Sequence, residues 1–198
     1  DKDKEIRKFK HDISAHINII RTYLDEKRYD DINKYLNEMY NNEYIRATVS
    51  YTGNSAVDAI INDYIRQAKE KNIMFKYNIK YFYNKNIKEF DICSIISNCL
   101  RNAIEACEKI DDISKRSVQL QIETIDDCLQ IVVINSIADK VEIIDNNLKT
   151  TKNDKRNHGM GSEIIKEIAE KYNGQVSFAS DNDFFTTDIF LQVGGINN

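Results

Sequence analysis

"NCLRNAIEAC", residues 98–107, sets a regular polar pattern on an apolar background. Asn98, Asn102 and Glu105 recur at intervals of four and three residues, which places them on one stripe of a helix. The other side of this predicted helix, residues 91–110, is apolar and consists of Ile95, Ile96, Cys99, Ala103, Ile104 and Cys107. Carboxamide oxygens on such a stripe suit Mg²⁺, which prefers oxygen ligands, although a solvated helix face shows the same pattern.

Strand patterns lie on both sides of this helix. The predicted strands cover residues 73–82, a hairpin over 118–135, and residues 175–180 and 186–193. The hairpin turns at Asp126 and Asp127. Before the first strand, Ser55 and Asp58 have the spacing of a capping box at the start of a helix. Because the order lacks a regular βαβ repeat, we expect an α+β protein whose main part is a layered α/β sandwich with a mixed sheet.

Two glycines precede the last predicted helix, in "NHGMGSEIIKEIAEKY", residues 157–172. Gly159 and Gly161 stand at the mouth of this helix, where backbone N–H groups and the positive end of the helix dipole favour a phosphate. The preceding polar stretch, residues 137–158, is too long for an ordinary connection and carries several cations: Lys149, Lys152, Lys155, Arg156 and His158. A plain turn between loop and helix is the alternative interpretation.

The strand "LQIVVIN", residues 129–135, ends in two polar residues, Asn135 and Ser136. Polar groups at a strand end often face a ligand, although an ordinary strand-end turn has the same composition.

Residues 1–50 carry a different pattern. Apolar residues alternate at three-and-four spacing, with His16 filling one position of this seam: Ile6, Phe9, Ile13, Ile20 and Tyr23. A second series follows the polar break at residues 25–31: Ile32, Tyr35, Leu36 and Met39. We expect a helical hairpin, two of which would form a four-helix dimer. Packing of both helices on the domain at residues 51–198 is the alternative.

His11 falls between seam positions, so we expect it on the outward face of the first helix, with Asp12 beside it. An imidazole near its ordinary pKa of about 6.5 is a competent nucleophile at neutral pH. Asp12 is placed to accept the N–H of the other ring nitrogen. His16, on the seam, is expected to be packed or hydrogen-bonded.

Composition excludes several classes of function. The net charge of −4 over 198 residues argues against a nucleic-acid partner. The four cysteines have neither metal spacing nor a disulfide framework, which favours reduced core residues in a cytosolic protein. No apolar run reaches the roughly 20 residues that span a bilayer, and the charged start is no signal peptide. We therefore expect a soluble part of a larger chain.

The order of these motifs resembles the ATP-binding domain of the GHKL superfamily. "NCLRNAIEAC" resembles its N-box, "INSIA" (residues 134–138) a degenerate first glycine box, and "HGMG" (residues 158–161) the second. With "FKHD" (residues 9–12) on the preceding heptad helix, the chain resembles the cytoplasmic part of a sensor histidine kinase. It is most similar to the AgrC-like peptide-pheromone receptors of low-GC Gram-positive bacteria.

The resemblance implies roles for three asparagines. Asn102 would hold the Mg²⁺ that bridges the ATP phosphates, and Asn98 would contact a phosphate or a metal-bound water. Asn135 would meet the adenine, where the superfamily more often has aspartate.

It also implies that Gly159 and Gly161 close over the phosphates, with Lys152 as a helper. Thr187 would lie near the nucleotide. Ser162 stands where the family usually has leucine.

The implied function is autophosphorylation of His11 with Mg-ATP, assisted by Asp12, and transfer of the phosphoryl group to an aspartate of a response regulator. The hairpin at residues 1–50 would form a homodimer. A membrane sensor would precede this chain in a receptor of the bacterial inner (cytoplasmic) membrane. Ala15 replaces the Asn or Thr that supports phosphatase activity in related kinases.

Two other classes stay open. A GHKL protein that phosphorylates serine on a regulator, or uses ATP only for closure, would bind ATP without modifying His11. A non-catalytic dimeric adaptor would bind no nucleotide, and the degenerate "INSIA" segment favours it.

Overall fold

The computed structural model describes residues 2–40, 49–80, 86–144, 146–148 and 158–194. The chain divides into two compact units, Asp1–Ala47 and Thr48–Asn198. None of the helices within the described ranges is long and apolar enough to cross a bilayer. The roles that the sequence suggests for the parts 1–50 and 51–198 stay predictions.

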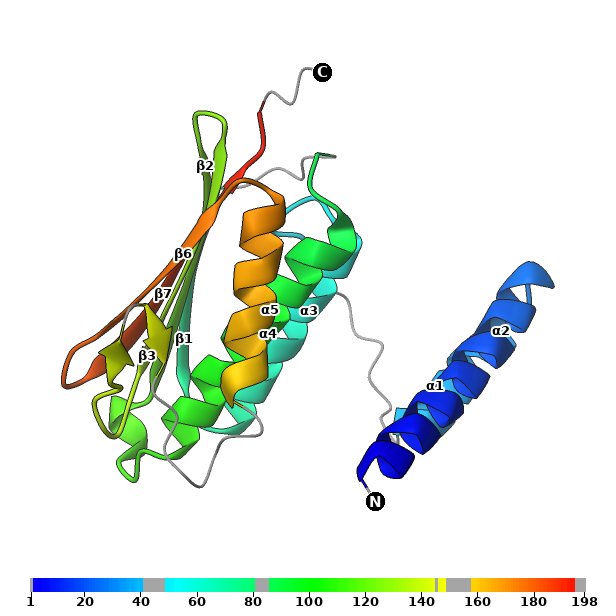
Figure 1. Cartoon of the computed structure of the whole chain (residues 1–198). Coiled ribbons are helices and arrows are strands. Elements are labelled where there is room, and N and C mark those ends of the chain that lie inside the picture. The colour runs from blue at the N-terminus through cyan, green and yellow to red at the C-terminus, as the bar shows by residue number, and fades with distance from the viewer. Residues whose placement is uncertain (1, 41–48, 81–85, 145, 149–157, 195–198) are drawn as a thin grey trace. The chain divides into compact units, whose positions relative to one another are not determined.

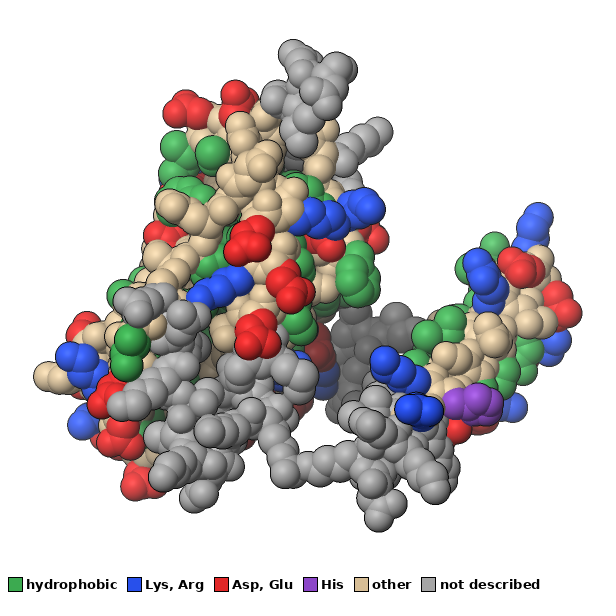
Figure 2. All heavy atoms as spheres, viewed as in Figure 1, with side chains coloured by type: hydrophobic (Ala, Val, Ile, Leu, Met, Phe, Trp, Pro, Cys, Tyr) green, Lys and Arg blue, Asp and Glu red, His purple; other side chains and the backbone are tan. Residues whose placement is uncertain are grey.

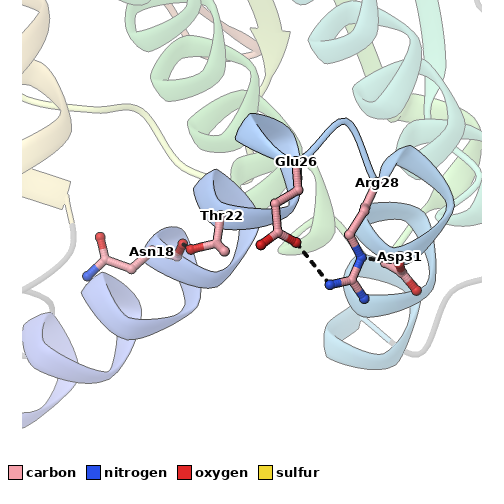
Figure 3. Close-up of polar contacts among 5 residues, drawn as sticks. All are labelled: Asn18, Thr22, Glu26, Arg28 and Asp31. Carbon is pink, nitrogen blue, oxygen red and sulfur yellow. Dashed lines mark hydrogen bonds and ion pairs between the residues drawn. The ribbon is translucent and has the colours of Figure 1, made fainter.

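The first unit is a hairpin of α1 (Lys2–Asp25) and α2 (Tyr29–Tyr40), as predicted. The turn between them is fixed by Arg28, whose Nε donates to Asp31 at 2.7 Å and whose Nη1 donates to Glu26 at 3.0 Å (Figure 3). Lys27 has a left-handed backbone with φ of 58°, which reverses the chain within this short connection.

Polar and aromatic side chains join the two helices of the hairpin. His16 Nδ1 and the Tyr35 hydroxyl are 2.7 Å apart, and Tyr23 meets Tyr35 edge to face. The prediction of a packed, hydrogen-bonded His16 is therefore confirmed. Ile13, which the spacing assigns to the seam, remains 39% exposed, because one partner helix covers only part of the apolar face of α1.

The second unit is a two-layer sandwich. Its five-stranded sheet has the order β1-β2-β3-β7-β6, in which β1 and β2 are parallel and the other pairs antiparallel. The strands are β1 (Met74–Lys80), β2 (Ser117–Ile125), β3 (Cys128–Ser136), β6 (Gln175–Ser180) and β7 (Phe184–Gln192). Three helices lie side by side on one face of the sheet (Figure 1): α3 (Ser55–Glu70), α4 (Glu89–Glu108) and α5 (His158–Lys171). The predicted sandwich with a mixed sheet is confirmed.

The core lies between this sheet and the helices. Strands β2, β3 and β7 alternate buried and partly exposed residues, and their buried residues face the apolar side of α4. Ile95, Ile96, Cys99 and Cys107 of α4 are all buried there, as the helical spacing predicts. The four cysteines are free thiols, and burial raises the pKa of Cys99 to about 12.

The start of α3 differs from the predicted capping box. Asn54, one residue earlier than expected, accepts hydrogen bonds from the N–H groups of Ala56 and Val57. Asp58 instead accepts from the preceding loop, including the N–H and hydroxyl of Thr52 at 2.9 and 2.7 Å. Burial opposes ionisation of Asp58, but these hydrogen bonds outweigh it and lower its pKa.

A buried carboxylate ties α4 to α5. Asp91, near the start of α4, accepts hydrogen bonds from the Lys171 ammonium and from the Tyr172 hydroxyl, the latter at 2.6 Å. The Tyr172 hydroxyl accepts in turn from the N–H of Lys88 at 3.0 Å. This network fixes the C-terminal end of α5 against α4, and therefore sets where the other end of α5 lies.

Within the polar stretch 137–158, the structure describes a small hairpin of β4 (Ile143–Ile144) and β5 (Asn147–Leu148). Asn146 turns it with a φ of 57° and bonds the edge strand β6: Nδ2 donates to the Val176 carbonyl at 2.6 Å, and Oδ1 accepts from the Phe178 N–H at 3.1 Å. The sequence patterns predicted neither of these two short strands.

Candidate functional site

The polar stripe of α4 has two asparagines in different states. The Asn98 carboxamide is engaged at both ends, since Nδ2 donates to the Ser94 carbonyl at 2.8 Å and Oδ1 accepts from Arg101 Nη2 at 2.6 Å. For Asn102, one turn later and half-buried, no hydrogen bond is found among the described residues. Asn102 therefore has a carboxamide available for a ligand, whereas Asn98 is held by its neighbours.

The start of α5 lies directly against this stripe. A methyl carbon placed on Gly161 would be 3.2 Å from Asn98 Oδ1, 3.4 Å from Asn102 Nδ2 and 3.5 Å from Arg101 Nη2. Glycine therefore favours the close approach of α5 to these side chains, and no unusual φ is involved. The sequence placed both glycines before this helix, but the helix begins at His158, so Gly159 and Gly161 lie in its first turn.

The first N–H groups of α5 have no partner inside the helix, and they coincide with the positive end of the helix dipole. Asn98, Asn102 and Gly161, which the sequence predicted as ligand contacts, are therefore neighbours in space. Arg101 completes this group, although the spacing argument missed it. Its position three residues after Asn98 was a signal, because residues three apart are neighbours on a helix surface.

A second polar group lies on the covered face of the sheet. Asn135 is 4% exposed and Thr187 is 7% exposed, at the ends of the buried rows of β3 and β7. Asn135 is paired in register with Phe185, and Thr187 is two residues further along β7. The two side chains therefore point to the same side of the sheet as diagonal neighbours.

Asn135 is oriented by its own strand. Its Nδ2 donates to the Ser136 carbonyl at 2.9 Å, which leaves Oδ1 as a hydrogen-bond acceptor. Within the described part of the chain, neither this oxygen nor the Thr187 hydroxyl has a hydrogen-bond partner. Since none of the described fully buried side-chain oxygens or nitrogens is unpaired, both oxygens must reach solvent-accessible space.

An aromatic pair adjoins these two oxygens. Phe185 is paired with Asn135, and Phe178 with Thr187, so both rings stand on the covered face of the sheet. The rings stack with centroids 6.0 Å apart, and Lys166 Nζ of α5 lies 5.5 Å from the centroid of Phe178. Two acceptors beside flat apolar rings are typical of a site for a planar heterocycle. Neither ring was among the predicted site residues, although Phe185 alternates with Thr187 and Phe178 with Val176 along their strands.

The end of β3 is held in place by contacts with β2 and α4. The Ser136 and Ser117 hydroxyls are 2.8 Å apart, and the Cys107 thiol donates to the Ser136 carbonyl at 3.6 Å. Burial raises the pKa of Cys107, which keeps it a neutral thiol. The Ser136 carbonyl also accepts from Asn135, so α4 and β2 help to position the Asn135 side chain.

Several predicted residues fall elsewhere. Lys152 and the other cations at residues 149–156 lie outside the described residues, as does the side chain of His158. The described residues contain no cluster of three His, Cys, Asp or Glu side chains that could hold a metal ion. Among the described residues of this stripe, the Asn102 carboxamide is therefore a group that remains available to a divalent cation.

His11 and Asp12 belong to the helical unit. The His11 side chain is 85% exposed and Asp12 54% exposed, with Nδ1 and Oδ1 3.5 Å apart, at the long limit of a hydrogen bond. Figure 2 shows a histidine at the surface of this unit, with Lys and Arg side chains nearby. The predicted outward position of His11 agrees with this exposure, while its role in catalysis stays a prediction.

The sequence of the second unit shows the family of this protein. The family model described as "GHKL domain" matches residues 87–192, and the chain belongs to this family. The matched range runs from the start of α4 to the end of β7 and contains the asparagines, the glycines and Thr187. No curated protein sequence matches the chain.

Solved histidine kinase structures share this fold. The nucleotide-free catalytic domain of histidine kinase ThkA matches with a TM-score of 0.53 and 15% identity, over 75% of this chain and 97% of that one. The histidine kinase domain of the blue-light activated kinase EL346 from Erythrobacter litoralis gives 0.50 and 12%, over 75% and 67%. Full-length ShkA in complex with AMPPNP gives 0.50 and 14%, over 78% and 33%. At these identities the likeness concerns the fold alone.

Proposed function

We propose that the chain is the kinase part of a sensor histidine kinase, in which the GHKL domain binds Mg-ATP and donates its γ-phosphoryl group to His11. The observation that carries this proposal is the close approach of Gly161, in the first turn of α5, to the side chains of Asn98 and Asn102. That approach joins helix N–H groups with a free carboxamide, which suits a phosphate chain.

The two ends of the nucleotide would be recognised by different elements. Asn135 Oδ1 and the Thr187 hydroxyl are available to the amino group of adenine, with Phe185 and Phe178 beside them. Asn102 and the start of α5 are available to the phosphates. The full-length ShkA structure contains AMPPNP, which supports a nucleotide site on this fold.

The residues of the stripe fit a magnesium ion. Asn102 offers an oxygen ligand without another partner among the described residues, and Mg²⁺ commonly takes one or two protein oxygens besides phosphates and water. Bound Mg²⁺ would neutralise part of the charge on the phosphate oxygens. Asn98 would support the site through Arg101 and Ser94 rather than ligate the metal.

The transfer step follows from the chemistry of His11. With Nδ1–H directed to Asp12, the lone pair of Nε2 attacks the γ-phosphorus, an N–P bond forms, and the bond to the β–γ bridging oxygen breaks. The electrons of that bond leave with ADP. The imidazolium then loses its Nδ1 proton to Asp12 or water, which leaves a neutral imidazole ring that carries the anionic phosphoryl group as a phosphoramidate.

The further parts of the proposal come from the sequence. The phosphoryl group would pass to an aspartate of a response regulator, the hairpin would form a homodimer, and a membrane sensor of the peptide-pheromone receptor class would precede this chain. The exposed apolar residues Ile13, Ile17 and Leu24 of α1 support dimerisation. Ala15 argues against a phosphatase activity of the kind that depends on Asn or Thr at that position.

The test is incubation with γ-labelled ATP and Mg²⁺. We expect a label that is labile in acid, stable in alkali, absent from His11→Gln and retained in the matched control His16→Gln. An acid-stable label would identify a serine kinase instead. Binding of Mg-ATP without any label would leave a nucleotide-driven clamp, and absence of both would leave the adaptor.

A further inference from the structure

Arg101 has an unusual place among the described arginines of this domain. It lies on α4 one residue before Asn102, and its Nη2 donates to Asn98 Oδ1 at 2.6 Å. The same nitrogen is 3.5 Å from the position of a methyl carbon on Gly161. The guanidinium therefore lies beside the first turn of α5, while the side chain as a whole remains exposed.

A cation at this point is electrostatically unfavourable by itself. The N-terminus of a helix carries partial positive charge, so it favours anions and disfavours a neighbouring guanidinium. Arg66 of α3, by contrast, is paired with Asp63 and Glu70, and Arg116 donates to the Ile110 and Lys71 carbonyls. Within the described ranges no carboxylate is paired with Arg101.

The arrangement becomes favourable when an anion joins the two positive groups. A guanidinium has five N–H donors in a planar fork, and the Asn98 contact uses one side of it. The other donors can meet phosphate oxygens in bidentate fashion, next to the free N–H groups of α5. Asn98 holds the guanidinium in place, since it is itself fixed to Ser94.

We propose that Arg101 binds a phosphate group of the nucleotide directly and thereby makes the site selective for the phosphorylated ligand. This inference rests on the proposed function, because it assigns a further contact to the same nucleotide site. In this view Asn98 is a positioning residue, and Arg101 together with Asn102 and the start of α5 contacts the ligand.

The test compares nucleotide affinities of the whole 198-residue chain and two variants. Arg101→Gln removes the charge in the site, and Arg66→Gln makes the same change on α3 as the matched control. Dissociation constants are measured by calorimetry for ATP, ADP and adenosine with Mg²⁺. Melting temperatures verify that the variants are folded. We expect Arg101→Gln to lower the affinities for ATP and ADP by about 10- to 100-fold, as for the loss of a hydrogen bond to a charged group. The affinity for adenosine should not change.

The outcomes separate the two levels of the argument. If the unchanged chain binds no Mg-ATP, the proposed function itself fails. If it binds Mg-ATP and Arg101→Gln binds it equally well, the proposed function stands and the role of Arg101 is refuted. An equal loss of affinity for ATP, ADP and adenosine would also refute the inference, because Arg101 would then only maintain the shape of the site. Arg66→Gln should leave all three affinities unchanged.

Discussion

Gly161→Ala separates the folding role of α5 from its role in binding. Alanine favours a helix over glycine by about 1 kcal/mol, and Gly161 has no positive φ that alanine would resist. Its new methyl group would lie 3.2 Å from Asn98 Oδ1, so the carboxamide must shift and weaken its bond from Arg101. That bond is worth about 1.5–3 kcal/mol, partly regained by water at this exposed arginine. The free energy of unfolding should therefore change by no more than about 1–2 kcal/mol.

Nucleotide binding should respond much more strongly to the same substitution. The methyl group would stand 3.4 Å from Asn102 Nδ2 and 3.5 Å from Arg101 Nη2, within the space between both side chains and the start of α5. We expect the affinity for Mg-ATP to fall at least about tenfold, or about 1.4 kcal/mol. Calorimetry and urea unfolding measure the two quantities, with Glu163→Ala on the exposed side of α5 as control. Unchanged affinity in Gly161→Ala would refute the assignment of this contact to the phosphate site.

Three further predictions concern other parts of the domain. Because its bond to Ser136 leaves Asn135 Oδ1 as an acceptor for the amino group of adenine, the site should bind ATP more tightly than GTP. Asn135→Ala should lower the affinity for ATP by about 3- to 10-fold. Equal affinities for ATP and GTP in a competition assay would contradict this assignment. Gly174→Ala should destabilise the fold by several kcal/mol in urea unfolding, since the methyl carbon would lie 1.9 Å from the Phe190 carbonyl oxygen; a stable variant would show that β7 can move. Burial opposes ionisation of Asp91, but the hydrogen bonds from Lys171 and Tyr172 outweigh it and lower the pKa of this carboxyl below its value in the unfolded chain. The ionised carboxylate therefore stabilises the folded state above about pH 4, and this contribution is lost as the pH falls. Asp91→Asn should thus cost about 1–3 kcal/mol at pH 7 and little near pH 2, and a cost independent of pH would argue against this linkage.

The periodicity of α4 was sufficient to predict both the core and the polar stripe. A helix buried on one side must repeat its apolar residues at helical spacing, so the sequence alone places Ile95 and Cys99 inward and Asn98 and Asn102 together. Spacing cannot distinguish the two asparagines, however, because both occupy the same stripe. Their difference arises from Arg101 and Ser94, which engage only Asn98.

Helix starts were harder to predict than helix faces. Asn54 and Ser55 are both good capping residues, and the choice of Asn54 depends on Asp58 being occupied by the loop before α3. The first turn of α5 contains two glycines, which disfavour helix, yet it forms where Gly161 packs against α4. In both places contacts from other elements outweigh the local preference.

The side-chain bridge from Asn146 to β6 has a consequence for solubility. A sheet that ends in a bare strand offers unpaired backbone groups to other copies, and such edges promote aggregation. By occupying the Val176 carbonyl and the Phe178 N–H, Asn146 blocks strand addition at one border. At the opposite border, β1 carries Lys76 and Lys80, whose charges repel an incoming copy. In concentrated solutions, the Asn146→Ala variant should therefore form fibrous aggregates sooner than the unchanged protein.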